Sequence, residues 1–309
     1  MKGSVIIPVR GDAPYLARCL ESVIKGAGSF EIILVDDGLT LEAREQLKAF
    51  EGRVRVLEST GKGASRARNL AARQSSADFI AFTDSDCIVD RHWIEELLKG
   101  FDAFPGVVAC GGPQRLPADA TAFEARVFLF MQHAGIISDY VRTPSGDRIV
   151  FVKHNPSCNV MYKRDIFLES GGFLENFWPG EDVELDWRLH GKGYSLVTNP
   201  KAVVYHYKPT DMALFARMMS RYGWAQGCLV RMHGVTRLLH LAALGALAVL
   251  LIVIALFIIN PFAAVSLIVG MAAALYVYCC FRRLDLRLLL TGIFFWHRGF
   301  LKGICAPGR

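Results

Sequence analysis

The chain has 309 residues, a formal net charge of +6 at pH 7 and a mean hydropathy of +0.30. It exceeds one average domain, and its hydropathy is high for an entirely soluble enzyme. The basic residues do not gather into one stripe with interleaved aromatic side chains, so we expect no nucleic-acid partner; anionic lipids and a diphosphate ligand explain them better.

Short runs rich in Val, Ile and Phe alternate with helix-like segments in the first part of the chain. The runs cover residues 4–9, 31–35, 54–57 and 79–83, and helical patterns cover residues 15–24 and 64–73. This alternation predicts an α/β fold with a mostly parallel, doubly wound sheet and helices on both faces. Ligands bind such sheets beyond the carboxyl ends of the strands.

Polar motifs lie where the expected strands end. They are Pro8-Val9-Arg10, Asp36-Asp37-Gly38 and Asp84-Ser85-Asp86. The two carboxylates of the last motif predict a site for Mg²⁺ or Mn²⁺, because both ions prefer oxygen ligands. Asp36-Asp37-Gly38 taken alone is also typical of a tight turn. Gly61-Lys62-Gly63 precedes the helix that follows the third strand. It is not a Walker phosphate-binding loop, because the final Gly-Lys-Ser/Thr of that motif is missing.

A second acidic motif, Gly180-Glu181-Asp182, begins a helical pattern that runs to His190. It supplies a carboxylate that can act as a general base. The alternative is structural, since carboxylates also stabilise a helix N-terminus through the helix dipole.

The regular alternation weakens after Gly112. Residues 122–137 predict a helix, residues 138–148 a polar loop, and residues 212–232 an amphipathic helix on a bilayer surface. We expect an α/β domain over residues 1–210, an interfacial helix over 211–237 and a membrane hairpin with a terminal segment over 238–309.

Two apolar stretches follow, over residues 238–259 and 262–281, separated by Asn260-Pro261. Each is long enough to span a bilayer. Arginines precede the first stretch and follow the second, so the positive-inside rule predicts an integral, multi-pass chain with both flanks and the catalytic domain in the cytoplasm. The N-terminus is too short in its apolar part to be a secretory signal. Residues 288–304 predict an interfacial or partial third membrane segment.

The eight cysteines are scattered without a C-x-x-C pair. We therefore expect buried thiols rather than a zinc site or a disulfide framework.

The motifs together resemble the inverting family-two glycosyltransferases of the GT-A fold, in their membrane-attached form. The resemblance covers roughly the first two hundred residues. It depends on the shared order of six motifs: residues 5–9, Val35-Asp36-Asp37-Gly38, residues 63–69, Thr83-Asp84-Ser85-Asp86, Asn155-Pro156-Ser157-Cys158-Asn159 and Gly180-Glu181-Asp182.

The resemblance implies a donor site for a nucleotide-sugar. Asp37 would lie near the base or ribose, with Pro8 and Val9 lining that pocket, and Asp84 would reach the ribose. Three further residues are assigned to the donor: Arg66, Arg68 and Glu181. The arginines would pair with diphosphate oxygens, although an exposed face of their helix is the plainer interpretation.

The resemblance also implies the chemistry. Asp86 would bind the Mg²⁺ or Mn²⁺ ion that neutralises the departing diphosphate. His206 would contact the metal or the diphosphate, although a lone histidine in a strand is often a half-buried residue with a structural role only. Asp182 would be the general base that deprotonates the acceptor hydroxyl, with inversion at the anomeric carbon.

The expected function is transfer of a single sugar to a membrane-associated acceptor, such as a polyprenyl phosphate or a polyprenyl-diphosphate-linked glycan. Polymerising relatives carry Q-x-x-R-W after the base, whereas this chain has Asp186-Trp187-Arg188, which disfavours a processive synthase. Two alternatives remain open: a nucleotidyltransferase, and a non-catalytic membrane scaffold with a transferase-like fold.

Overall fold

The computed structural model describes residues 2–59, 61, 63–134 and 146–306. Lys62, the last residues of the helix expected over 122–137 and most of the polar loop expected over 138–148 lie outside the described residues. The chain forms two compact units, one of Met1–Ala120 with Ser138–Tyr207 and one of Thr121–Ile137 with Lys208–Arg309.

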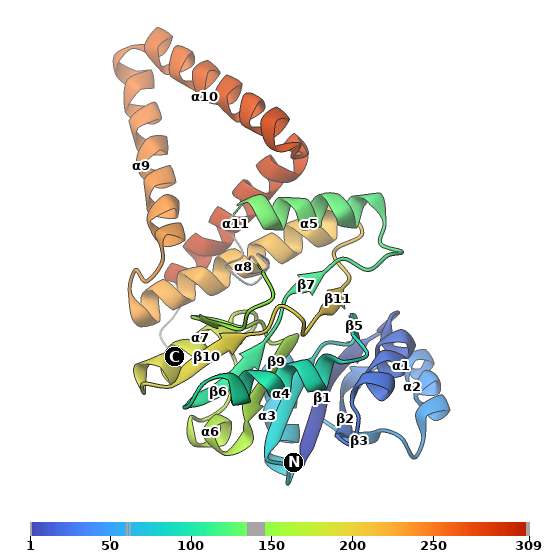
Figure 1. Cartoon of the computed structure of the whole chain (residues 1–309). Helices are drawn as coiled ribbons and strands as arrows, with labels where there is room; N and C mark the ends of the chain where they lie inside the picture. The colour runs from blue at the N-terminus through green and yellow to red at the C-terminus, as the bar shows by residue number, and fades with distance from the viewer. Residues whose placement is uncertain (1, 60, 62, 135–145, 307–309) are drawn as a thin grey trace. The chain divides into compact units, whose positions relative to one another are not determined.

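The first unit is built on an eight-stranded sheet with the order β3-β2-β1-β4-β9-β6-β10-β8 (Figure 1). The strands are β1 (Gly3–Gly11), β2 (Glu31–Leu39), β3 (Arg55–Glu58), β4 (Phe79–Thr83), β6 (Val107–Gly111), β8 (Val150–Val152), β9 (Asn159–Lys163) and β10 (Ser195–Thr198). The first four pair in parallel, as the sequence predicts. The other half of the sheet is mixed, because β9 runs antiparallel to both β4 and β6, and β8 runs antiparallel to β10.

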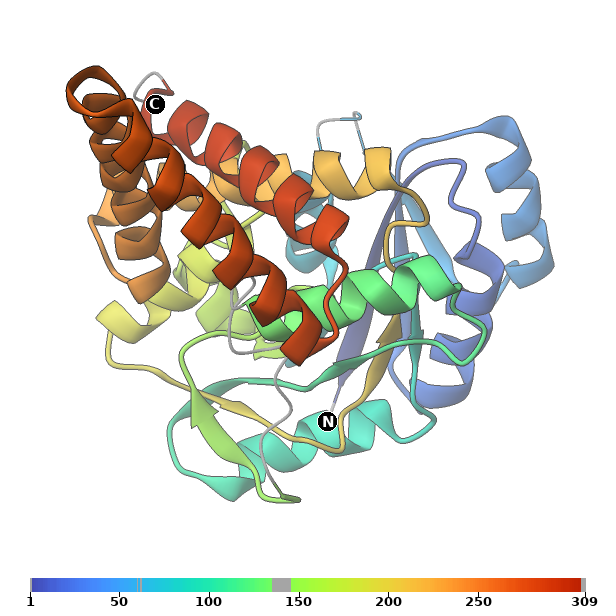
Figure 2. The ribbon, with the colours of Figure 1, turned by 90° about the horizontal axis from the view of Figure 1, so that it is seen from above.

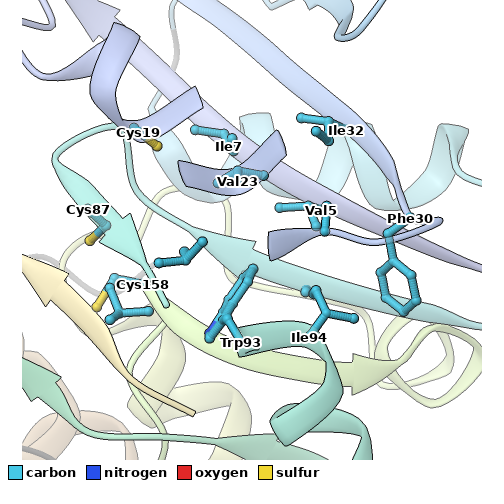
Figure 3. Packing of buried hydrophobic residues seen from close by; sticks show 14 of the residues in the cluster. Val5, Ile7, Cys19, Val23, Phe30, Ile32, Cys87, Trp93, Ile94 and Cys158 are labelled. Carbon is cyan, nitrogen blue, oxygen red and sulfur yellow. The ribbon is translucent and has the colours of Figure 1, made fainter. Parts of the chain in front are cut away.

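Helices cover both faces of this sheet. One core contains side chains of α1 (Leu16–Gly26), α2 (Leu41–Leu47) and α4 (Trp93–Ala103), and the other those of α3 (Ala64–Gln74), α6 (Arg164–Glu169) and α7 (Glu181–Gly191). Val5 and Ile7 of β1 enter the first core and Ile6 the second, since successive side chains of a strand point to opposite faces. Figure 3 shows the first core, with Val23 and Trp93 from helices packed beside Val5 and Ile7. This confirms the doubly wound prediction. A 3₁₀ turn, η1 (Lys48–Phe50), follows α2.

A second, three-stranded sheet has the order β5-β11-β7. Its strands are β5 (Cys87–Val89), β7 (Gln114–Arg115) and β11 (Val204–His206). Asn159 at the start of β9 binds beside it: its side-chain amide donates to the carbonyls of Pro113 and Ala202, and its oxygen accepts from Trp93 Nε1 at 2.7 Å. These buried bonds hold the small sheet against the ends of the large one.

The second unit is helical: α5 (Ala122–Ala134), α8 (Met212–His233), α9 (Leu238–Ile259), α10 (Pro261–Arg282) and α11 (Leu286–Ile304). The expected boundary near residue 210 lies close to Tyr207, where the first unit ends. However, α5 groups with the C-terminal helices, because Phe130 packs edge-on against Phe215 of α8 and Glu124 accepts from the Lys208 amide.

Helices α8 and α11 lie side by side (Figure 2). A Cβ atom added at Gly227 would lie 2.2 Å from the Phe300 carbonyl oxygen, and one at Gly303 would lie 2.1 Å from that of Trp224. The two backbones therefore touch, as in membrane helix pairs that meet through small residues spaced four apart.

Among the described residues, two helices are long and apolar enough to cross a membrane, Leu239–Ile259 and Pro261–Arg282. Most of their side chains are exposed, unlike those of a core helix. Asn260 begins α10, its side chain accepting from the Ala263 amide at 3.1 Å, with Pro261 at the first helical position. By length and composition these helices suggest association with a membrane.

Candidate active site

The Asp84-Ser85-Asp86 motif forms a turn between the large and small sheets. β4 is fully buried, and the Cys87 amide closes the turn by donating to the Asp84 carbonyl at 3.1 Å. β5 then pairs with β11 so that Cys87 stands opposite His206. One ligand atom each from Asp84, Asp86 and His206 lies within 4.8 Å of the others, and Asp86 Oδ1 is 3.4 Å from His206 Nε2.

The His206 ring is oriented from its other side. Its Nδ1 lies 2.9 Å from Oε1 of Gln114 on β7. An acceptor at Nδ1 favours the tautomer that carries its proton there, which directs the Nε2 lone pair towards Asp86. Sequence reasoning missed Gln114, because a two-residue strand leaves no periodic pattern.

Asp84, Asp86 and His206 fit a divalent cation. Carboxylate oxygens suit Mg²⁺ and Mn²⁺, and an imidazole nitrogen also suits Mn²⁺. Ligand distances of about 2.0–2.2 Å require ligand atoms about 3–4 Å apart, which small rotations of these partly exposed carboxylates can reach from their present spacing.

Arg68 lies beneath this turn and is 1% exposed. Its Nη2 donates to Asp84 Oδ1 at 2.5 Å and its Nη1 to Glu181 Oε1 at 2.8 Å. Burial disfavours the charged guanidinium, but the two carboxylates together raise the pKa of Arg68 above its ordinary value. Arg68 therefore positions Asp84 and Glu181, and direct contact with a diphosphate stays a prediction.

Arg66 occupies a different place on the same helix. It is 41% exposed, and its Nε is 3.8 Å from Glu175 Oε2. Arg66 thus lies on the more exposed face of α3, as the structural alternative predicted. Its contact with the donor stays a prediction.

The acidic pair at the start of α7 divides into a buried and a more open carboxyl. Gly180 precedes the helix with φ 100°, a conformation that favours glycine. Glu181 is 1% exposed and also accepts from Ser157 Oγ at 3.2 Å. Burial, and then the charge of Asp182, raise the pKa of Glu181 to about 8, although Arg68 opposes this.

Asp182 is half-buried. Its Oδ2 accepts from the Ser157 amide at 2.9 Å and its Oδ1 from the Val183 amide at 2.8 Å. Both oxygens are fixed by backbone donors, and each retains a lone pair for a further hydrogen.

Asp37 is buried at the end of β2. Its Oδ1 accepts from Ser59 Oγ at 2.7 Å and its Oδ2 from the Gly63 amide at 2.9 Å, which joins β2 to the segment before α3. Pro8 and Val9 are buried in β1 beside Val35 and Asp36. The structure thus brings these residues to one sheet edge, and their contact with a nucleotide stays a prediction.

A buried polar network holds the Asn155-Pro156-Ser157 segment. Asp186 accepts from the Asn155 amide at 2.8 Å and from Tyr162 Oη at 2.8 Å, and its Oδ2 lies 2.9 Å from His154 Nδ1. Burial raises the pKa of Asp186. The sequence singled out the segment as a motif, but Asp186 only as a departure from Q-x-x-R-W; the structure shows that it positions the segment that binds Asp182.

Two thiols lie directly behind the cation ligands. Cys87 and Cys158 are buried, and both form a group with His206 whose ligand atoms lie within 4.8 Å of one another. A hydrogen bond between the thiols lowers the pKa of Cys158, while burial raises the pKa of Cys87. Six of the eight cysteines are buried as expected, these two among them, whereas Cys280 and Cys305 are exposed.

Comparison with known proteins identifies the family. The model described as Glycosyl transferase family 2 matches residues 4–169, more than half of the chain, so the chain belongs to that family. Pre-mycofactocin glycosyltransferase of Mycobacterium tuberculosis is 28% identical over 238 residues, which cover 74% of this chain and 48% of that protein. Glycosyltransferase AglE of Haloferax volcanii is 29% identical over 205 residues, 62% of each chain. The chain spans about half the length of the first of these relatives.

Solved structures show the same fold. The mannosyltransferase PcManGT from Pyrobaculum calidifontis, in complex with GDP-Man and Mn²⁺, superposes with a TM-score of 0.71 at 17% identity, covering 99% of this chain and 88% of that one. GalNAc-T7 with UDP, GalNAc and Mn²⁺ gives a TM-score of 0.53 at 16% identity, covering 76% of this chain and 51% of that one. The predicted glycosyltransferase family and α/β GT-A fold are confirmed.

Proposed function

We propose that this member of glycosyl transferase family 2 moves one sugar, with inversion, from a nucleotide diphosphate-sugar to a membrane-associated acceptor. The observation that carries the proposal is the meeting of Asp84, Asp86 and His206 at the carboxyl end of β4, within 4.8 Å of one another. Membership of the family favours sugar transfer over the nucleotidyltransferase and scaffold alternatives.

Asp84, Asp86 and His206 would hold a divalent cation. Two fold neighbours were solved with Mn²⁺, one with GDP-Man and one with UDP and GalNAc, which supports the same class of ion and donor here. When bound, such an ion offsets the charge of a leaving diphosphate. The nitrogen ligand favours Mn²⁺ over Mg²⁺, which prefers oxygen and retained water.

Asp182 would remove the proton of the acceptor hydroxyl. It is more accessible than Glu181, and its orientation is fixed by the amides of Ser157 and Val183. Glu181 is committed to Arg68 and Ser157, so it supports the site from within rather than reacting. A positioned base contributes about 10²- to 10⁴-fold to rate.

The donor would lie along the ends of β1, β2 and β4. Pro8, Val9 and Asp37 would border the nucleotide end, and Asp84 would reach the ribose; the parallel pairing of β1 with β2 and β4 supports this by bringing the ends of these strands together. Arg68 acts through Asp84, which it holds at 2.5 Å. Arg66, which is 41% exposed, remains available to reach a diphosphate.

The acceptor would be a lipid-linked molecule such as a polyprenyl phosphate or a polyprenyl-diphosphate-linked glycan. Support comes from the two candidate spans, α9 and α10, together with the arginines that flank them. The positive-inside rule then favours an integral, two-span attachment with the catalytic unit in the cytoplasm.

The test combines a donor screen with a base variant. Purified full-length protein is supplied with a panel of nucleotide-sugars, with and without polyprenyl phosphate, in Mn²⁺ or after chelation. Asp182→Asn should retain nucleotide binding and lose about 10²- to 10⁴-fold in transfer. Asp165→Asn, at an exposed acid in the first turn of α6, is the matched control and should transfer normally. Near-normal turnover of Asp182→Asn would remove the base assignment.

A further inference from the structure

His206 belongs to two groups of possible metal ligands, one with hard carboxylate oxygens and one with soft thiol sulfurs. On one side lie the carboxylates of Asp84 and Asp86, and on the other the thiols of Cys87 and Cys158. The cysteines come from segments far apart in the chain, β5 and the segment before β9. Figure 3 shows them next to each other at the end of the hydrophobic core.

The geometry of the thiol group suits a tetrahedral ion. Zn–S bonds of about 2.3 Å and Zn–N bonds of about 2.0 Å place ligand atoms about 3.5–3.8 Å apart in a tetrahedron. The Sγ atoms of Cys87 and Cys158 and a ring nitrogen of His206 lie within 4.8 Å of one another. Asp86 Oδ1 is 3.9 Å from Cys87 Sγ and 3.4 Å from His206 Nε2, so it can complete the set.

We propose that Cys87, Cys158 and His206 form a binding site for a thiophilic divalent cation, Zn²⁺ or Cd²⁺, that excludes the hard cation of the Asp84–Asp86 site. His206 Nδ1 lies 2.9 Å from Gln114 Oε1, so we assign Nε2 to either ion, and its lone pair can bind one ion at a time. Two thiolates and an imidazole bind zinc far more tightly than two carboxylates and an imidazole, because soft ligands select such ions. Binding forms two metal–sulfur bonds, and any proton that either thiol still holds is released to solvent.

The plainer interpretation is that the two thiols are small apolar side chains of the core, which is the usual role of buried cysteine. In that case the thiols would not bind one equivalent of Zn²⁺ or Cd²⁺, and such an ion would not compete with the cation at Asp84 and Asp86. The exclusion of the hard ion depends on the proposed function, but ion binding by the thiols does not, so the two can fail separately.

Binding is tested by titrating Cd²⁺ into metal-free, full-length protein in detergent and following thiolate-to-cadmium charge-transfer absorbance. Serine replaces the exposed Cys280 and Cys305 in every sample. We expect saturation at one equivalent. Cys87→Ser and Cys158→Ser should lose the stoichiometric band. Cys110→Ser, at a buried thiol outside the group, should keep it.

Competition is tested by the electron paramagnetic resonance signal of Mn²⁺, which reports free and bound ion without any turnover. Zn²⁺ should displace Mn²⁺ from the parent protein, and Cys158→Ser should need at least about 100-fold more Zn²⁺, since losing a direct ligand costs more than losing an outer-shell partner.

Thermal unfolding of each variant confirms folding, and Cys158→Ala is used if the serine variant does not fold. A band that survives in both cysteine variants, or no band in the parent protein, overturns the site. Stoichiometric Cd²⁺ with undisturbed Mn²⁺ overturns the exclusion.

Discussion

The buried guanidinium of Arg68 provides the sharpest test of how this site is held together. Arg68 is 1% exposed and binds Asp84 at 2.5 Å and Glu181 at 2.8 Å. Arg68→Met keeps an unbranched side chain of similar length but removes both charged hydrogen bonds. Asp84 and Glu181 then lose their shared counter-charge.

The expected cost follows from the burial of the three groups. Removing one partner of a buried ion pair costs about 3–5 kcal/mol. The lower end applies here, because Asp84 is 28% exposed and Glu181, with its pKa raised to about 8, can hold a proton at neutral pH. A loss of about 3 kcal/mol in a unit of this size lowers the melting temperature by about 6–12 °C.

The assay is thermal unfolding of the purified chain in detergent, monitored by tryptophan fluorescence. Arg66→Met is the matched control on the same helix: its side chain is 41% exposed and its nearest carboxylate oxygen is 3.8 Å away. We expect that control to change stability by less than about 0.5 kcal/mol. If Arg68→Met melts together with Arg66→Met, the buried triad does not stabilise the unit and the reasoning is wrong.

Three further predictions concern buried acids, amides and glycines. The pKa of Glu181 is raised from 4.5 to about 8 on folding, so the native state binds more protons than the unfolded state between these two pH values, and stability falls as pH rises through this range. Glu181→Gln should remove this fall, which is measured as the melting temperature against pH. Asn159→Ala should cost about 3 kcal/mol, because three buried hydrogen bonds are lost at about 1 kcal/mol each, and denaturant titration measures it. Gly227→Ile should separate α8 from α11 and lower the melting temperature, whereas Gly270→Ala, where a Cβ meets nothing within 4 Å, should not.

The parallel half of the fold could be predicted because its strands are continuous apolar runs of ordinary length. β1, β2, β3 and β4 agree with the predicted runs to within one or two residues at every boundary except the end of β2, which extends to Leu39. The mixed half could not, since β9 and β8 gain their places by pairing with strands distant in the chain. β5, β7 and β11 have only two or three residues each, too few to show a period.

At the site, the sequence singled out the acids as a group, and the structure brings Asp84 and Asp86 together beside His206, but the sequence did not indicate how the charged residues are paired. Arg68 looks like a surface residue by type, yet Ala67 and Ala71 beside it on α3 are core residues. That pattern of small neighbours was the available signal that its side chain enters the interior. The pairing of Arg68 with Glu181 joins residues 113 positions apart, which no local pattern encodes.

Charge is the reason why we expect the proposed site to use a cation in addition to the buried arginine. The carboxylates of Asp84, Glu181 and Asp182 gather around the guanidinium of Arg68, and Asp86 lies close to Asp84. A unit charge 4 Å from another contributes about 4 kcal/mol at an effective dielectric constant of 20, and a micromolar ligand gains only about 8 kcal/mol in all. A diphosphate entering such a site would therefore lose its affinity to repulsion. Arg68 is already committed to Asp84 and Glu181, and the raised pKa of Glu181 removes only one negative charge. The remaining excess lies on the partly exposed carboxylates beside His206, so we expect the proposed donor diphosphate and divalent cation to bind there together.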